Sequence, residues 1–230
     1  MVVNIKGMKL EIIVMWQAKL IKNGYVQLNN FLSESQANQL RSDILKASHY
    51  KAWDLLTTPY HPLCRIKDEI SSRVIDKKRH VQATTAYHRK EFSFSFYRSN
   101  NKFAKQHNNA SIHQTLANQV VKVVSKPLGL DGTLRDTFFA SFVKGQFIDY
   151  HTDGSAGKYA FIYQLSKGWQ PIFGGQLELY PKRIKFYKTI LQPTFNSLAI
   201  LKLDHPMPHS VRMLNNPKHK HRITISGWLE

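Results

Sequence analysis

The sequence predicts an α+β protein that is mainly β, with a closed or double-layered sheet of the barrel or jelly-roll kind and helices outside it. Two observations support this fold class. From Asp131 onward the chain breaks into about eight short apolar segments separated by turns at regular spacing, which is typical of strands. Before that point, helix-capping signals are followed by apolar residues at helical spacing.

Helices are expected at two places in the first half of the chain. In "FLSESQANQLRSDILKAS", Ser33 can cap a helix and Gln36 can complete a capping box. The same signal, Ser111 with Gln114, opens "SIHQTLANQVVKVVSK". We expect both helices to pack against one layer of the sheet.

Two strands are also expected in this half. The apolar run "LEIIVMW" is too short to cross a bilayer and is interpreted as a buried strand. The segment "EFSFSFY" alternates strictly and puts Phe92, Phe94 and Phe96 on one face, which we interpret as core with no catalytic role.

The second half supplies the main sheet. Its expected strands are "TFFASFV", "QFIDYHT", "YAFIYQLS", "GGQLELY", "IKFYKTIL", "SLAILKL", "HSVRML" and "RITISGW". No linker separates the halves. We therefore expect one domain over residues 1–230, with a support layer at 1–130 and a β core at 131–230.

Composition narrows the class of protein. A single cysteine, Cys64, excludes an internal disulfide, a cysteine zinc site and an iron–sulfur cluster within one chain. We expect no disulfide-linked partner, no signal peptide, no membrane association and a cytoplasmic location. The net charge of +18 favours an anionic partner such as nucleic acid or a ribonucleoprotein, although a solvated basic surface would give the same composition.

The stretch "DYHTDGSAG" contains a candidate pair of metal ligands. With eleven histidines in the chain, one His-x-Asp motif is a weak signal by itself. Here, however, His151 and Asp153 end an apolar strand and precede a flexible turn. Residues two apart on an extended chain face the same way, so both side chains can point into one pocket.

His209 in "PHSV" is the candidate third ligand, because it begins another strand. Two histidines and one carboxylate leave open positions on a metal, an arrangement that suits non-haem Fe(II). The alternative for His209 is a surface histidine in a proline-rich turn. A helical zinc pair with His205 is excluded, since Pro206 and Pro208 break any helix there.

Arg222 in "HRITISGW" is the candidate anchor for a second ligand. A pocket-facing buried guanidinium requires a carboxylate, and no acidic residue lies near it in sequence. A dicarboxylate such as 2-oxoglutarate would chelate iron at one end and meet Arg222 at the other, with a further hydrogen bond from Thr224. The alternative is an exposed strand residue beside Lys220.

With these motifs the sequence resembles the iron- and 2-oxoglutarate-dependent dioxygenases, in particular the prolyl-hydroxylase-like branch that includes ribosomal-protein prolyl hydroxylases. The motifs that carry the resemblance are "YHTDG", "FGGQLELY", "PHSV" and "HRITISGWLE". It implies a double-stranded β-helix (jelly roll, cupin-like) buttressed by N-terminal helices. It also implies iron held by His151, Asp153 and His209, and 2-oxoglutarate held by Arg222.

The sequence departs from this branch at two positions. Phe142 stands where a tyrosine usually lies near the cosubstrate, and Gln164 stands where a second tyrosine often meets the far carboxylate. Gln164 can still donate a hydrogen bond through its amide. The cosubstrate is therefore expected to bind, while a strict prolyl specificity is less firmly implied.

The resemblance implies an enzyme that uses Fe(II), 2-oxoglutarate and O₂, with ascorbate as a candidate reductant. The leading interpretation is hydroxylation of a prolyl or other side chain in a protein or peptide, for which the basic composition suggests a ribosomal or nucleic-acid-associated target. One alternative is a hydroxylase of a free amino acid or small metabolite. Another is a non-catalytic binding module of the same fold, which would have no need of three metal ligands.

Overall fold

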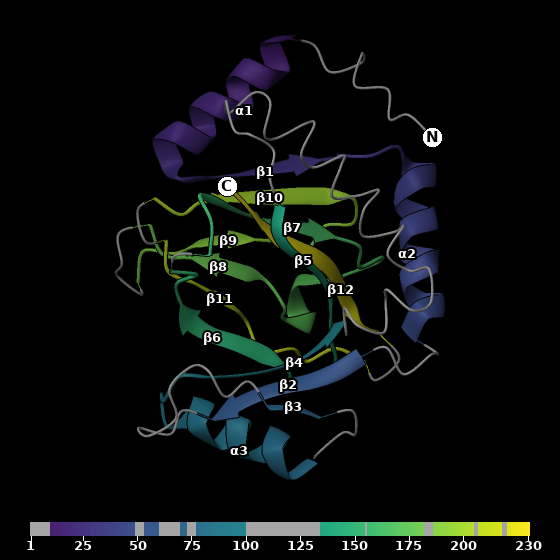
Figure 1. The fold of residues 1–230 in the computed structure, drawn as a ribbon, viewed down its shortest axis with the longest axis vertical. Helices are drawn as coiled ribbons and strands as arrows, with labels where there is room; N and C mark the ends of the chain where they lie inside the picture. Colours follow the sequence, from purple (N-terminus) through teal and green to yellow (C-terminus); the bar gives the residue numbers. More distant parts are fainter. Residues whose placement is uncertain are drawn as a thin grey trace.

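The computed structural model describes residues 10–48, 53–59, 70–72, 77–99, 134–154, 156–181, 186–204, 207–217 and 220–230. Within these ranges, three α-helices lie outside a strongly curled sheet (Figure 1). They are α1 (Leu10–Asn23), α2 (Glu34–Ser48) and α3 (Lys77–His88). A short 3₁₀ helix, η3 (Pro171–Phe173), lies between the strands at Tyr159–Gln164 and Leu177–Leu179.

The first apolar run forms a helix, so the expectation of a strand there was wrong. Helix α1 continues past that run, and Trp16 and Leu20 are buried one turn apart. Gly24 ends the helix with a φ of 76°, and its N–H donates to the carbonyl of Leu20. A run of seven residues, six of them apolar, fits a buried strand or a buried helix equally well. The helical spacing of buried residues becomes visible only when the next turn, with Leu20, is included.

The capping box predicted for α2 is confirmed. The N–H of Gln36 donates to the Ser33 hydroxyl, and the N–H of Ser33 donates to the side-chain oxygen of Gln36. Ala37, Leu40 and Ile44 then face the core. The second predicted helix, at 111–126, lies outside the described residues.

All the strands that are described belong to one antiparallel sheet. Their bounds are β1 (Tyr25–Asn29), β2 (Trp53–Pro59), β3 (Ile70–Ser72), β4 (Ser93–Ser99), β5 (Leu134–Phe142), β6 (Phe147–His151), β7 (Tyr159–Gln164), β8 (Leu177–Leu179), β9 (Thr189–Leu191), β10 (Ser197–Lys202), β11 (His209–Val211) and β12 (Arg222–Leu229). Each of the eight segments predicted in the second half contains one of these strands. The main path runs β1-β10-β7-β12-β5-β4-β6-β11-β8-β9.

The sheet folds back on itself at β4, which pairs with both β5 and β6. One half, β1-β10-β7-β12-β5, therefore faces the other half, β6-β11-β8-β9 (Figure 1). Apart from the consecutive pair β8 and β9, neighbouring strands in each half are not consecutive in sequence, as in a jelly roll. The double-stranded β-helix expected from the resemblance is confirmed. Strands β1 and β4 show that the N-terminal part contributes strands to this sheet as well as helices.

Two hydrophobic cores stabilise this arrangement. The outer core joins α1 and α2 to the outward face of β5, β7, β10 and β12, with Trp16, Ile44 and Tyr163 among its members. The inner core lies between the two halves of the sheet and contains Phe142 and Leu179. The cavity described below borders this inner core and is lined by residues from both halves of the sheet.

Two further expectations can be compared with the structure. Among the described residues, no helix is long and apolar enough to cross a membrane. The assignment of residues 1–230 to one domain stays a prediction.

Candidate active site

His151, Asp153 and His209 come together at one end of the inner core. The donor atoms of the three side chains lie within 4.8 Å of one another. Nε2 of His151 and Nε2 of His209 are each 3.6 Å from Oδ1 of Asp153. Three ligand atoms from two separate parts of the sequence therefore converge on one point.

The pairing of β6 with β11 explains this convergence. His151 at the end of β6 and His209 at the start of β11 are direct partners across the two strands. Their rings lie 4.3 Å apart, centroid to centroid. Asp153 follows β6 by two residues, and Gly154, with a φ of 57°, turns the chain immediately after it.

Backbone carbonyl groups set the orientation of both imidazole rings. Nδ1 of His151 lies 2.8 Å from the carbonyl oxygen of Asp149, and Nδ1 of His209 lies 2.9 Å from that of Met207. A ring nitrogen that faces a carbonyl carries the proton, so the lone pair is on Nε2. Both lone pairs then lie on the side of Asp153, so the three donor atoms are gathered where one metal ion could bind them.

Trp228 holds the second oxygen of the carboxylate. Its indole N–H donates to Oδ2 of Asp153 at 3.1 Å, which leaves Oδ1 facing the two histidines. Burial raises the pKa of Asp153, but the neighbouring side chains of His151, His209 and Trp228 outweigh burial and lower that pKa to about 2. The sequence signal for this role is the position of Trp228 six residues after Arg222, on the same face of an alternating strand.

His209 is the most deeply buried of the three ligands. Burial is the main reason that its pKa falls to about 4, and the neighbouring His151 lowers it further. The imidazole is therefore neutral near pH 7 and can offer its lone pair to a metal ion without first losing a proton.

Arg222 begins β12, in the opposite half of the sheet. It is 1% exposed, and its guanidinium carbon lies 4.9 Å from the centre of the Phe142 ring. Among the described residues no carboxylate pairs with it, and its Nε has no hydrogen-bond partner. Burial lowers its pKa to about 9, so the side chain is still a cation at neutral pH. A buried cation of this kind requires an anionic ligand.

Thr224 and Gln164 lie beside Arg222 as direct partners on β12 and β7. Thr224 faces the cavity and contacts Ser226 at 3.5 Å through its hydroxyl. Gln164 is buried next to it but does not line the cavity, and its side-chain oxygen finds no partner among the described residues. Both residues therefore lie near Arg222, but only Thr224 also lines the cavity.

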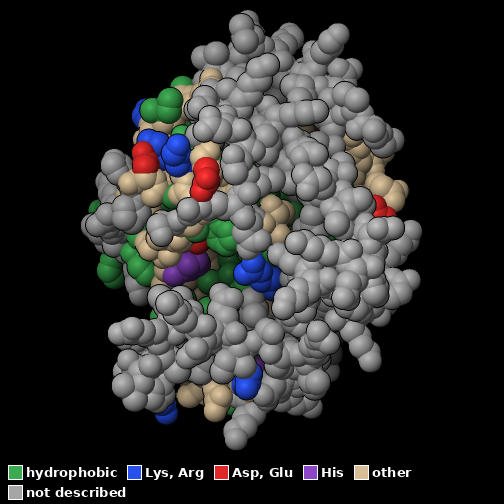
Figure 2. Space-filling view, viewed as in Figure 1, with side chains coloured by type: hydrophobic (Ala, Val, Ile, Leu, Met, Phe, Trp, Pro, Cys, Tyr) green, Lys and Arg blue, Asp and Glu red, His purple; other side chains and the backbone are tan. Residues whose placement is uncertain are grey.

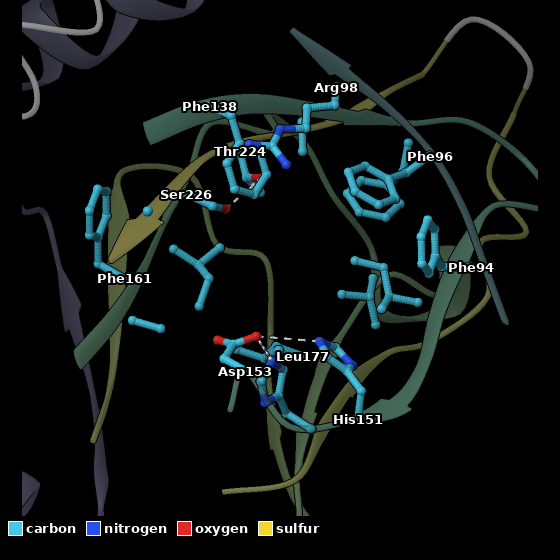
Figure 3. Close-up of a pocket in the computed structure, with 18 of the residues that line it drawn as sticks. Phe94, Phe96, Arg98, Phe138, His151, Asp153, Phe161, Leu177, Thr224 and Ser226 are labelled. Atoms are coloured by element: carbon cyan, nitrogen blue, oxygen red, sulfur yellow. Dashed lines mark hydrogen bonds and ion pairs between the residues drawn. The ribbon is translucent and has the colours of Figure 1, made fainter. Parts of the chain in front are cut away.

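A cavity of about 560 Å³ connects the triad to Arg222. Figure 2 shows a hollow on this face in which a histidine lies among hydrophobic side chains and a basic side chain. In Figure 3, His151 and Asp153 lie at one end, and Thr224, Arg98 and Phe138 lie at the other. The volume is within the range of small-molecule sites, about 300–1,000 Å³.

The phenylalanines of β4 form one wall of this cavity. Phe92, Phe94 and Phe96 all line it, so the expectation that they are purely core was incomplete. Phe92 lies 6.1 Å from the ring of His151, and Phe96 stacks on Phe142 at 5.2 Å. This aromatic wall therefore extends from a candidate metal ligand to the ring beneath Arg222.

The site fits a divalent metal ion together with a dicarboxylate. Two imidazole lone pairs and one carboxylate oxygen form a facial donor set that suits Fe(II) and leaves positions open. The buried Arg222, with its unpartnered Nε, provides the charge that the far carboxylate of 2-oxoglutarate would meet.

Comparison with known proteins agrees with this geometry. Residues 138–230 match the sequence model described as the 2OG-Fe(II) oxygenase superfamily. The chain carries a 2OG-Fe(II) oxygenase domain. This domain contains the complete His–Asp–His triad and Arg222, and the family's cofactors are Fe(II), 2-oxoglutarate and O₂. The chain is accordingly a dioxygenase.

The fold of this oxygenase is that of prolyl hydroxylases. It is similar to a Pseudomonas putida prolyl-4-hydroxylase, with 16% identity, a TM-score of 0.61, and coverage of 95% of this chain and 98% of that one. It is also similar to a Trichoplax adhaerens prolyl hydroxylase solved with a hypoxia-inducible-factor peptide, with 18% identity, a TM-score of 0.67, and coverage of 95% and 89%.

Other comparisons limit what the fold implies. The oxygenase is similar to SnoN, a non-haem α-ketoglutarate-dependent epimerase of nogalamycin biosynthesis, with 10% identity, a TM-score of 0.58, and coverage of 94% of this chain and 81% of that one. One fold thus serves more than one reaction, and the substrate must be argued from the site. A search of curated proteins finds no significant match.

Proposed function

We propose that this oxygenase hydroxylates an amino-acid side chain, with a prolyl residue of a protein or peptide as the preferred target. The observation that carries the proposal is the His–Asp–His triad in one cavity with a buried arginine that has no carboxylate partner among the described residues. The similar prolyl hydroxylases support the choice of target, and one of them was solved with a peptide.

We assign His151, Asp153 and His209 as the iron ligands, and Arg222, Thr224 and Gln164 as the residues that bind 2-oxoglutarate. When bound, Fe(II) and 2-oxoglutarate supply the oxidising power that converts a C–H bond, 2-oxoglutarate and O₂ into C–OH, succinate and CO₂.

The protein's own residues have three tasks in this reaction. The backbone carbonyls of Asp149 and Met207 keep each imidazole proton on Nδ1, so that Nε2 of each ring stays available to the metal. Arg222 neutralises the far carboxylate in a site where water cannot. The apolar wall of β4 excludes water and positions the target carbon.

The proposal is tested with two variants of the purified, iron-loaded enzyme. His151→Ala should abolish substrate-dependent succinate formation, because a metal ligand is lost. Arg222→Ala should keep iron but raise the 2-oxoglutarate concentration needed for half-maximal rate at least tenfold, since the far carboxylate is left unpaired. Succinate is quantified by mass spectrometry, and normal turnover by His151→Ala would refute the assignment of His151.

A free amino acid or small metabolite is the second candidate substrate. The observation that favours it is an inward-facing arginine, Arg98, in the cavity wall, because a free amino acid carries its own carboxylate. Incubation with free amino acids and, separately, with a peptide extract distinguishes the two, since only the true substrate gains the mass of one oxygen atom.

We further propose a ribosomal or nucleic-acid-associated target for the protein-directed activity. The net charge of +18 supports it, because a basic surface attracts polyanions. The test measures RNA binding at increasing salt concentration. An affinity that falls steeply as salt is added would support the proposal, and a lack of RNA binding at low salt would contradict it. The cytoplasmic location and the use of ascorbate stay predictions.

A further inference from the structure

Three connections between strands gather at one end of the folded sheet. They join β7 to β8, β9 to β10 and β11 to β12, and their described residues are 165–176, 192–196, 212–217 and 220–221. The metal triad lies at the other end, because His209 begins β11 whereas the connection to β12 leaves from the end of β11. A partner bound to these connections would therefore leave the triad free.

Hydrogen bonds hold the connections side by side. The N–H of Asn215 donates to the carbonyl of Phe173 at 2.8 Å. Nζ of Lys220 donates to the carbonyl of Gly168 at 3.0 Å. The connection before β12 therefore packs along the connection before β8, and the two form one surface.

This surface is basic. The described residues of the three connections include no Asp or Glu. Lys167 is exposed and Lys220 is partly exposed. At the opposite end of the sheet, by contrast, Asp153 follows β6 and Asp204 follows β10. A polyanion is therefore attracted to the end that carries the connections.

Each of the two lysines lies over an aromatic ring. Nζ of Lys220 is 5.2 Å from the centre of the Phe173 ring, and Nζ of Lys167 is 5.0 Å from the centre of the Phe195 ring. Both phenylalanines are partly exposed. Cations and ring faces thus alternate across this surface.

Trp169 adds a third ring to the surface. It meets Phe173 edge-on, with 5.6 Å between the ring centres, and its indole N–H donates to the carbonyl of Gly174 at 2.8 Å. Trp169 is partly exposed, and Ile172 beside it is 77% exposed. The rings are held in place before any ligand binds, so a ligand that stacks on them has little ordering to do.

We propose that Lys167, Trp169, Phe173, Phe195 and Lys220 form a binding surface for single-stranded RNA. The lysines contact phosphates, and the rings stack with bases, as in other proteins that bind single strands without sequence preference. A single strand fits better than a duplex, because its bases are free to stack on side chains. This inference rests on the proposed function, since it locates the contact with a nucleic-acid-associated target.

The charges are tested with a fluorescein-labelled strand of ten uridines, whose binding to the intact enzyme is followed by anisotropy at increasing salt. Such a strand is within the range of about 4–16 nucleotides that a single-strand site covers. Lys167→Gln combined with Lys220→Gln should weaken binding at least tenfold at low salt. It should also reduce the slope of log affinity against log salt by about 1.4, since each lysine on a phosphate of a single strand contributes about 0.7.

The rings are tested separately with Phe173→Leu, which keeps an apolar side chain and removes the stacking face. This variant should weaken RNA binding about tenfold and leave the salt slope unchanged, because no charge is lost.

The matched control is Lys19→Gln combined with Lys22→Gln. Both lysines are exposed on α1, outside the proposed surface, and the pair removes the same charge. It should weaken RNA binding less than twofold. All these variants should bind 2-oxoglutarate within twofold of the wild type, because Arg222 and the triad are unchanged.

Several results would overturn the inference. They are a wild type that does not bind the strand at low salt, an equal loss in the control pair, and tighter binding of a duplex of the same length. Tighter binding of polyglutamate would assign the surface to an acidic protein instead, and tighter binding of phosphatidylserine vesicles would assign it to a membrane.

Failure of the proposed oxygenase reaction would look different. In that case the wild type would form no succinate with any substrate and would show no absorption change when 2-oxoglutarate is added to the Fe(II) form without O₂. With both signals intact, a negative RNA result concerns this surface and the nucleic-acid-associated target alone.

Discussion

Single hydrogen bonds decide which atoms of the triad face a metal ion. Two backbone carbonyls fix the histidine tautomers, and the indole of Trp228 occupies one oxygen of Asp153. The sequence predicts the ligands themselves, because His-x-Asp at a strand end is a local pattern. It does not predict the partners of the ligands, since Trp228 lies 75 residues from Asp153 in the sequence and contacts it only in the folded chain.

Trp228→Phe is expected to weaken Fe(II) binding about tenfold, because a partner that orients a ligand is lost while the aromatic packing remains. Fe(II) affinity is measured by anaerobic titration. Trp169→Phe is the control, since Trp169 also donates an indole hydrogen bond, in this case to the carbonyl of Gly174. Equal iron affinity in both variants would show that the bond to Asp153 has no such role.

The buried His209 predicts a pH dependence for the iron-free protein. Its pKa falls from 6.5 to about 4 on folding, mainly by burial, so between these values the unfolded chain binds a proton that the folded one does not. The free energy of unfolding should therefore decrease as the pH falls from 6.5 towards 4, by up to about 3 kcal/mol.

Urea denaturation at a series of pH values measures this dependence. His209→Gln removes the titrating group and should flatten the curve in this window. An equally steep curve in the variant would assign the effect to other residues.

At the scale of elements, the turn before β8 packs against Arg222 and limits where its side chain can lie. Gly174 and Gly175 both have positive φ, at 73° and 72°. A Cβ on Gly175 would lie 2.8 Å from Cδ of Arg222, and a Cβ on Gly174 would collide with the carbonyl of Met213. Both the turn and the close packing at this pair therefore require glycine.

Gly175→Ala should raise the 2-oxoglutarate requirement several-fold and leave Fe(II) affinity unchanged, because the new methyl group displaces Arg222. The requirement is read from succinate formation at increasing 2-oxoglutarate. Gly168→Ala imposes a similar backbone strain of about 1 kcal/mol at a φ of 57°, but its Cβ would meet only the end of Lys220, at 3.6 Å. A shift of equal size in this control would attribute the effect to strain.

Another element-scale feature joins the start of α2 to the sheet. Asn196 has a φ of 59° and precedes β10. Its side chain accepts from the N–H of Leu32 at 2.9 Å, donates to the carbonyl of Leu32 at 2.8 Å and accepts from the hydroxyl of Tyr163 at 2.7 Å. An asparagine at a turn is a local signal, but the long-range partners of Asn196 depend on the pairing of β10 with β1 and with β7.

Asn196→Ala is expected to lower the free energy of unfolding by about 2–4 kcal/mol, since buried polar groups lose their partners and alanine disfavours positive φ. Denaturation in urea measures the loss. Asn30→Ala is the control, because Asn30 also has a positive φ, of 52°, and is exposed. If both variants lose the same free energy, the backbone conformation explains the effect and the hydrogen bonds do not.

At the scale of the whole molecule, local patterns located the strands of the second half, while the assignment of the metal ligands stays a prediction. Alternation located β4, and turn spacing located the eight strands of the second half. Alternation could not show that the face of β4 borders a cavity, because this depends on β4 joining the two halves of the sheet. The helical form of α1 was missed for a similar reason, since its packing partners are residues far along the chain.

The candidate metal ligands belong to β6, the turn after it and β11, whereas Arg222 belongs to β12 in the facing half of the sheet. A ligand bound at both ends must have a length that matches the distance between these halves. The packing of the inner core therefore determines which ligand length fits. If 2-oxoglutarate binds as proposed, we expect weaker binding of oxaloacetate, which is one methylene shorter, and of 2-oxoadipate, which is one methylene longer. Selectivity among 2-oxo diacids is then a property of sheet spacing, and resizing an apolar side chain between the halves should alter it without touching either charged end.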